Sequence, residues 1–278
     1  MLLCADIIIF FLLKKLLTRN DLPVNRLLIY ALNPLIIIEY TGNLHFEGLM
    51  ILFLLAAILF SDKSNVMRSS IFMAASISSK LLTFILIPFM AFSMPWKKMI
   101  TWSLMTLGFT LLVFVLTFKG ETGWVESCRL WFQSFEFNAS IYYLIRAIGF
   151  WVTGYNAIKW IGPSMGLISI LLLYALWILF YRKKNFPWSA AMVFALTIYF
   201  LMSTTVHPWY IGTILALSVL SLHTYPVMWT YLVFLSYSHY SGGRFQENYF
   251  FIATEYAILF LWMMMEYRAK KKALAGST

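Results

Sequence analysis

Long apolar runs follow one another along the whole chain, and short polar or basic segments separate them. A helix of about 20 apolar residues crosses the roughly 30 Å hydrocarbon core of a bilayer. We interpret nine of the runs as membrane spans, and they are 2–17, 27–40, 46–61, 99–118, 159–181, 188–205, 208–222, 225–240 and 249–267. The pattern therefore predicts an all-α, polytopic membrane protein with a single transmembrane domain over residues 1–278.

Basic residues collect in five clusters between the predicted spans. They are Lys14, Lys15, Arg19 and Arg26; Lys63 and Arg68; Lys97 and Lys98; Arg182, Lys183 and Lys184; and Arg268, Lys270, Lys271 and Lys272. Cytoplasmic loops of membrane proteins carry an excess of Lys and Arg. We therefore expect all five clusters, and the C-terminus, on the cytoplasmic side of a bacterial inner membrane.

The segment 69–93 decides whether that topology is possible. Its 25 residues reach only about 37 Å as a helix, which is too short for two full crossings. We interpret it as a re-entrant hairpin of two short helices with Lys80 near the tip, because a single span would put Lys97 and Lys98 on the outer side. The alternative is one span here and a second, hidden span within 141–157.

The composition agrees with a membrane protein, since 62% of the residues are hydrophobic and only 12% are charged, against about 25% charged in soluble domains. The net charge of +10 follows from the basic loops, and we expect no nucleic-acid partner. The sequence contains no phosphate-binding Gly-rich loop and no paired Cys and His ligands. No cofactor and no protein-held metal are indicated, and a need for a divalent metal is left open.

Three polar segments share the predicted outer face, and they are 39–48, 204–210 and 241–248. The loop 119–158 joins this face, and its aromatic residues alternate with polar ones. That alternation is typical of interfacial helices lying flat on a membrane. Because the cytoplasmic loops are short and basic, we expect the chemistry on the outer face.

The segment 33–50, "NPLIIIEYTGNLHFEGLM", carries the densest polar group. A charge at mid-bilayer costs roughly 2.5–3.5 kcal/mol, so Glu39, Asn43, His45 and Glu47 need a reason to be there. Pro34 kinks the preceding helix, and unwound backbone at "TGN" would line a wet cavity. We take His45 and Glu47 as catalytic candidates and Glu39 and Asn43 as substrate-binding ones. The alternative is a polar helix cap that hydrogen-bonds neighbouring loops.

Further candidates are single polar residues in apolar surroundings. A lone cation there needs a phosphate or a carboxylate partner, so each cation could bind substrate or form a structural ion pair. Aromatic residues at a membrane interface are ordinary, and they become candidates here only beside a histidine. The remaining substrate-binding candidates are Lys80, Arg146, His207, Trp209, Tyr210 and Arg244.

The segments "NPLIIIEYTGNLHFEGLM", "SISSKLLTFILIPF" and "STTVHPWY" occur in this order, and together they resemble the bacterial polyprenol-phosphate-sugar-dependent mannosyltransferases of the GT-C superfamily. Thr83 stands where the family's hairpin carries a proline. The resemblance implies transfer of a hexose, mannose, from a polyprenyl-phosphate donor to a glycan, lipid or protein acceptor on the outer face.

The family carries an essential acidic residue in its first outer loop, and this sequence shows no such loop before "MLLCADIIIFF". Asp6 lies within a predicted span and does not replace that acid. We therefore expect an N-terminally truncated, C-terminal portion of a GT-C-like fold that is inactive alone. The competing interpretations are a transporter or lipid flippase, with the buried charges as its ion path, and an inactive fragment of the transferase.

Overall fold

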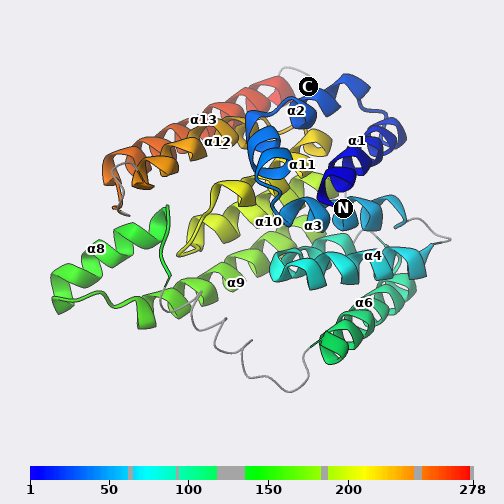
Figure 1. Cartoon of the computed structure of the whole chain (residues 1–278), viewed down its shortest axis with the longest axis horizontal. Helices are drawn as coiled ribbons and strands as arrows, with labels where there is room; N and C mark the ends of the chain where they lie inside the picture. Colours follow the sequence, from blue (N-terminus) through cyan, green and yellow to red (C-terminus); the bar gives the residue numbers. More distant parts are fainter. Residues whose placement is uncertain (62–64, 92–93, 118–134, 183–186, 241–245, 276–278) are drawn as a thin grey trace.

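The computed structural model describes residues 1–61, 65–91, 94–117, 135–182, 187–240 and 246–275 (Figure 1). Within these ranges the regular elements are all helices, and the only strand-like feature is an isolated β-bridge between Phe137 and Thr205. The all-α class is therefore confirmed for the described chain. The longer helices are α1 (Leu2–Arg19), α3 (Glu47–Leu59), α4 (Val66–Ser79), α6 (Trp96–Thr117), α8 (Ile141–Thr153), α9 (Ile158–Arg182), α10 (Trp188–Met202), α11 (Ile211–Ser221) and α13 (Tyr249–Ala275).

Short or irregular helices connect the longer ones. Two are α-helical, α2 (Leu28–Ala31) and α5 (Ile87–Ala91), and a third, α12 (Tyr225–Leu232), continues directly into a 3-10 segment. The irregular segments are the 3-10 helices η1 (Val24–Leu27), η3 (Leu81–Leu86), η4 (Pro208–Tyr210) and η5 (Val233–Tyr240) and the π-helix η2 (Ile36–Gly42).

Three helices are long and apolar enough to cross a bilayer, namely α6, α9 and α13. The pair η2 and α3 makes a fourth candidate if its two bent halves count as one span. The expectation of nine spans is therefore not supported by the described residues. Apolar runs such as 208–222 and 225–240 are broken by 3-10 turns into pieces shorter than the roughly 20 residues a crossing needs.

Helix α11 occupies the centre of the bundle, since all its residues are buried. It contacts α1, α3, α10 and α12, whereas α6 and α9 bury few of their residues and leave apolar side chains exposed. In Figure 1, α12 and α13 run side by side, α3 lies beside α4, and α8 projects at the edge farthest from α1. The exposed apolar helices are those expected to face lipid.

The sharpest bend in the chain lies between η2 and α3, whose axes differ by 103°. The π-helix runs through Gly42, and the turn follows over residues 43–46, where Leu44 has a φ of 55°. The main-chain N–H of Asn43 donates to Ile38 O at 2.8 Å, and the main-chain N–H of His45 donates to Glu39 O at 3.1 Å. The break therefore comes about two residues later than the expected unwinding at "TGN".

The described part of segment 69–93, residues 69–91, is a hairpin and not one continuous helix. Helix α4 ends at Ser79, Lys80 has extended backbone, and η3 and α5 turn back. The hydroxyls of Ser76 and Thr83 lie 3.1 Å apart across the turn. Lys98 donates to Ser61 O at 2.8 Å, so the chain after the hairpin returns beside the residues that precede it. Residues 141–157 hold no helix long enough to be the hidden span of the alternative, because α8 has only 13 residues.

Basic residues from several clusters meet at one end of the bundle, which we call the basic end. Arg19 donates to Leu59 O and Ile58 O at the end of α3, and Arg26 donates to Val219 O and Ser218 O at the end of α11. Lys270 approaches Leu222 O at 3.3 Å. These cations satisfy carbonyls that helix ends leave without an internal partner, and they oppose the negative end of each helix dipole. Members of three of the five predicted clusters, Arg19 and Arg26, Lys98, and Lys270, thus lie at the same end.

Candidate functional site

Eight of the ten predicted site residues lie together at the end of the bundle opposite the basic end. They come from η2, the turn after it, the start of α3, the tip of the hairpin, and η4 with the residue before it. We call this group the polar site, and its members are Glu39, Asn43, His45, Glu47, Lys80, His207, Trp209 and Tyr210. Of the other two, Arg146 lies in a separate cluster, and Arg244 falls outside the described residues.

The centre of the polar site is an ion pair between Glu47 and Lys80. Glu47 is the first residue of α3 and is buried, and its carboxylate benefits from the positive end of the helix dipole. Lys80 reaches it from the hairpin tip, and its Nζ lies 3.5 Å from the ring centroid of Tyr210. The ammonium is therefore held on one side by a carboxylate and on another by an aromatic face.

His45 lies between two carboxylates. Its Nε2 is 3.1 Å from Glu39 Oε2, and its Nδ1 is 3.9 Å from Glu47 Oε2. On a regular helix, residues two apart point about 200° away from each other. His45 and Glu47 can approach because the turn at Leu44, with its positive φ, comes directly before the first helical residue.

Glu39 is fully buried and accepts hydrogen bonds from several sides. The hydroxyl of Tyr237 donates to Glu39, and the side-chain amide of Asn43 donates to Glu39 Oε2 at 3.2 Å. With His45 on the same carboxylate, Glu39 is enclosed by protein groups. It is therefore placed to orient His45, and its expected contact with substrate stays a prediction.

Trp209 stands between two imidazole rings. Its ring lies 4.0 Å from that of His45 and 4.4 Å from that of His207, with interplanar angles of 15° and 10°. The hydroxyl of Tyr40 donates to Trp209 O at 2.7 Å. The indole therefore stacks with both imidazole rings in this arrangement, and its expected contact with substrate stays a prediction.

His207 is neutral at pH 7. Burial, followed by the nearby charges of Lys80 and His45, lowers the pKa of His207 to about 4. Its ring also lies 4.6 Å from Phe137 and 5.7 Å from Phe135. A neutral imidazole in this position can accept or donate one hydrogen bond without adding charge beside Lys80.

Arg146 belongs to a structural cluster beside the polar site. It pairs with both Glu136 and Glu247, and its Nη2 is 2.6 Å from Tyr249 Oη. Burial would lower the pKa of Arg146, but the hydrogen bond and charge of Glu247, with the charge of Glu136, outweigh it and raise that pKa. The guanidinium is thus matched by protein carboxylates, which is the structural alternative left open by the sequence.

Beside the polar site lies a short extended segment, residues 135–137, one residue of which pairs with Arg146. The amide of Phe137 donates to Thr204 O at 3.1 Å, and Val206 N donates to Phe137 O at 2.8 Å. In this extended segment successive side chains point to opposite sides. Phe137 therefore faces His207, while Glu136 faces Arg146.

Sequence reasoning missed three participants. Tyr237 and Tyr40 look like ordinary interfacial tyrosines, yet they hold Glu39 and Trp209. Asp6, which was set aside, lies beside the bend, with Oδ2 3.2 Å from Thr41 Oγ1. Its Oδ1 is 3.3 Å from where a Cβ on Gly48 would lie, so it flanks the residue next to Glu47. The signal available in the sequence was a lone carboxylate in an apolar run.

No metal-binding arrangement accompanies the site. Among the residues that the structure describes, no group of three or more His, Cys, Asp or Glu side chains is placed to hold a metal ion. The carboxylates of the polar site are instead engaged by Lys80, His45 and Tyr237. The arrangement is suited to proton transfer and to binding an anion near Lys80.

The first third of the chain connects this geometry to known proteins. Residues 1–96 match a mannosyltransferase family model. Its description is alpha-(1->6)-mannopyranosyltransferase, N-terminal domain, of the MptA/B family. The matched range contains the bend, Glu39, His45, Glu47 and Lys80, whereas His207, Trp209 and Tyr210 lie beyond it. No curated protein and no solved structure matches the chain.

Proposed function

We propose that the protein is a membrane-embedded mannosyltransferase that moves a hexose, mannose, from a polyprenyl-phosphate donor to an acceptor hydroxyl at the polar site. The observation that carries the proposal is the Glu47–Lys80 pair with His45 beside it, within the range that matches the mannosyltransferase model. We place this end on the outer face of a bacterial inner membrane and the C-terminus in the cytoplasm, because basic residues gather at the opposite end.

Lys80 binds the donor phosphate in this proposal. In the substrate-free chain its ammonium is paired with Glu47 and lies over the Tyr210 ring, while its side chain is still 30% exposed. A phosphate arriving at this exposed side competes for the ammonium. Negative charge grows on the phosphate as the glycosidic bond breaks, so a fixed cation stabilises the transition state more than the ground state.

Glu47 acts as the general base. Once the donor phosphate takes over Lys80, the Glu47 carboxylate is available for the acceptor hydroxyl. The acceptor oxygen forms a bond to the anomeric carbon, the bond from that carbon to the phosphate oxygen breaks with its electron pair, and the acceptor proton passes to Glu47. The products are the glycosylated acceptor and polyprenyl phosphate.

His45 and its supports hold Glu47 in position. Glu39 fixes one ring nitrogen of His45, and the other nitrogen faces Glu47. Trp209 fixes the ring plane. Contacts of this kind keep a catalytic side chain close to the position that efficient reaction requires.

A transfer assay in proteoliposomes tests the proposal against the expectation that residues 1–278 are inactive alone, which an absence of transfer would support. We expect polyprenyl-phosphate mannose to be consumed and mannose to appear on an acceptor, with Lys80→Met reducing donor use about tenfold or more and Lys80→Arg retaining part of it. The matched control is Lys97→Met, an exposed lysine at the start of α6. Equal, full activity of Lys80→Met and Lys80→Arg would remove Lys80 from the site. Movement of the intact donor across the bilayer without transfer would instead support the flippase alternative.

A further inference from the structure

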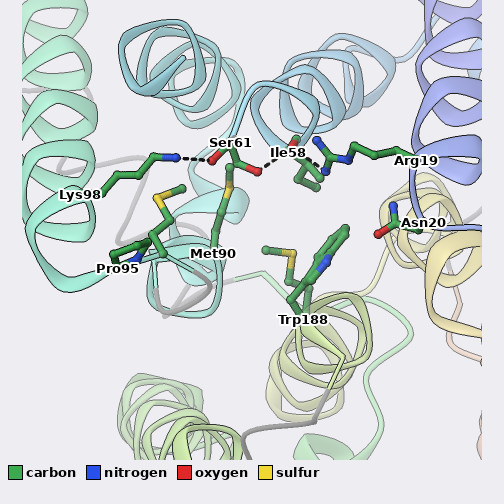
Figure 2. A pocket seen from close by; sticks show the side chains of 10 residues that line it. Arg19, Asn20, Ile58, Ser61, Met90, Pro95, Lys98 and Trp188 are labelled. Atoms are coloured by element: carbon green, nitrogen blue, oxygen red, sulfur yellow. Dashed lines mark hydrogen bonds between the residues drawn. The ribbon is translucent and has the colours of Figure 1, made fainter. Parts of the chain in front are cut away.

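A hollow of about 390 Å³ opens at the basic end, far from the polar site (Figure 2). Helices α1, α3, α5, α6 and α10 contribute to it. Along α3 it lies eleven residues beyond Glu47, which corresponds to about 16 Å of helix. The residues that line it are Arg19, Asn20, Ile58, Ser61, Met90, Met94, Pro95, Lys98, Trp188 and Met192.

One wall of the hollow is cationic. The guanidinium of Arg19 is held at the carbonyl end of α3, 2.7 Å from Leu59 O and 3.1 Å from Ile58 O. Lys98 Nζ is held 2.8 Å from Ser61 O, as Figure 2 shows. Two positive groups from different helices are thus fixed by main-chain acceptors along one side of the opening. Polar groups of Asn20 and Ser61 complete this wall.

The other wall is apolar and aromatic. Met90, Met94 and Met192 are buried, and Trp188 stands opposite Arg19 in Figure 2. Methionine side chains adapt to irregular apolar partners. A ligand that fills the hollow must therefore combine a negative group with an apolar part, which a free inorganic anion does not.

The hollow lies beside the start of a helix long enough to span a bilayer. Pro95 on its rim directly precedes α6, so the rim would lie near the membrane interface if α6 spans. Trp96 and Trp188 are at this level, as expected for an aromatic belt. Basic pockets between membrane helices at this depth attract anionic lipid headgroups.

We infer that this hollow binds the phosphodiester headgroup of an anionic phospholipid, with the phosphate facing Arg19 and Lys98 and the glycerol and upper acyl chain against Met90, Met94 and Trp188. The site is separate from the proposed transfer chemistry, and it gives the basic end a defined lipid partner. Arg forks suit phosphate oxygens, and Lys adds a second charge.

Native mass spectrometry of the detergent-purified full chain tests the inference with phosphatidylglycerol, phosphatidylcholine and inorganic phosphate as probes. We expect phosphatidylglycerol to be retained about tenfold more than phosphatidylcholine, and inorganic phosphate at millimolar concentration not to displace it. Equal retention of the two lipids, or displacement by inorganic phosphate, would overturn the inference.

Substitutions locate the binding. Pro95→Glu adds a carboxylate to the rim at the start of α6, where an acid suits the helix dipole, so the fold is retained and the preference for phosphatidylglycerol should fall about tenfold. Pro95→Gln is the matched neutral control and should keep it. Lys98→Gln should reduce the preference as well, while Lys97→Gln, which is next to it but outside the hollow, should not. An unchanged preference in Pro95→Glu and Lys98→Gln, or an equal loss in the controls, would show that the lipid binds elsewhere.

Discussion

The two ends of the bundle both carry cations, but they use them differently. At the basic end, Arg19, Arg26 and Lys98 donate to main-chain carbonyls at or just after the ends of helices. Lys270 at the same end approaches Leu222 O and also pairs with Glu266. At the polar site, Lys80 is paired with the side chain of Glu47. A main-chain carbonyl cannot move without unwinding its helix, whereas a side-chain carboxylate can exchange partners. The comparison teaches that the same residue types support the fold at one end and are available for chemistry at the other.

Helix α3 carries this contrast along its length. Its first residue is Glu47, and its last carbonyls are held by Arg19. Both charges suit the helix dipole. If the contrast is right, changes at the polar site should affect turnover more than abundance. Changes at the basic end should affect abundance more than turnover.

The largest effect is expected at Glu47. Glu47→Gln keeps the shape and removes the base, so turnover should fall about 10²-fold or more, with the amount of protein in the membrane unchanged. The measurement is initial transfer rate per folded molecule with a polyprenyl-phosphate donor. The matched control is Glu266→Gln, which breaks a Lys–Glu pair at the basic end, where Glu266 lies 2.8 Å from Lys270. Lost abundance with normal specific activity in Glu47→Gln would make Glu47 a structural cap.

How much of this could be predicted is clearest at the polar site. Its members meet because each lies where an apolar run is interrupted on the same side of the bundle. Such interruptions can be located from the sequence. The role of Arg146 was left open between substrate and a structural ion pair, because nothing local indicates that Glu136 and Glu247, ten and about a hundred positions away, contact it. The nine expected spans are not supported by the described residues, because composition does not reveal where a π-helix or 3-10 turn divides an apolar run.

The next effect concerns packing under the aromatic stack. A Cβ at position 212 would lie 2.2 Å from Tyr40 Oη, the hydroxyl that donates to Trp209 O. Gly212→Ala should therefore displace Tyr40, lower the free energy of unfolding by about 1–3 kcal/mol, and reduce transfer.

The control for this packing effect is Gly108→Ala in α6, where a Cβ would meet nothing within 4 Å. Chemical unfolding in detergent measures both. The cost of Gly212→Ala should be smaller in a Tyr40→Ala background, because the clash is gone. An equal cost in both backgrounds would show that Tyr40 is not the obstacle.

A smaller effect is expected at the basic end. Arg26 donates to Val219 O at 2.8 Å and Ser218 O at 3.2 Å, at the end of the buried helix α11. Arg26→Gln should lower the free energy of unfolding by about 1–2 kcal/mol and leave transfer per folded molecule unchanged. Lys15→Gln, an exposed lysine on α1, should change neither. Reduced specific activity in Arg26→Gln with normal stability would contradict the division between the two ends.

The smallest expected effect is a pH dependence of the stability that comes from His207 at the polar site and not from His223 at the basic end. The pKa of His207 is lowered to about 4, mainly by burial, from 6.5. The unfolded chain therefore takes up a proton before the folded chain does, so this residue's contribution to stability is complete above about pH 6.5 and is lost as pH falls toward 4. His207→Gln should flatten that part of the unfolding profile, measured between pH 4 and 8 in detergent. His223→Gln is the matched control at the basic end, where the imidazole contacts Glu266 at 2.6 Å. If the wild-type slope persists in His207→Gln, the acid sensitivity belongs to other groups, and the neutral ring beside Trp209 is not what sets it.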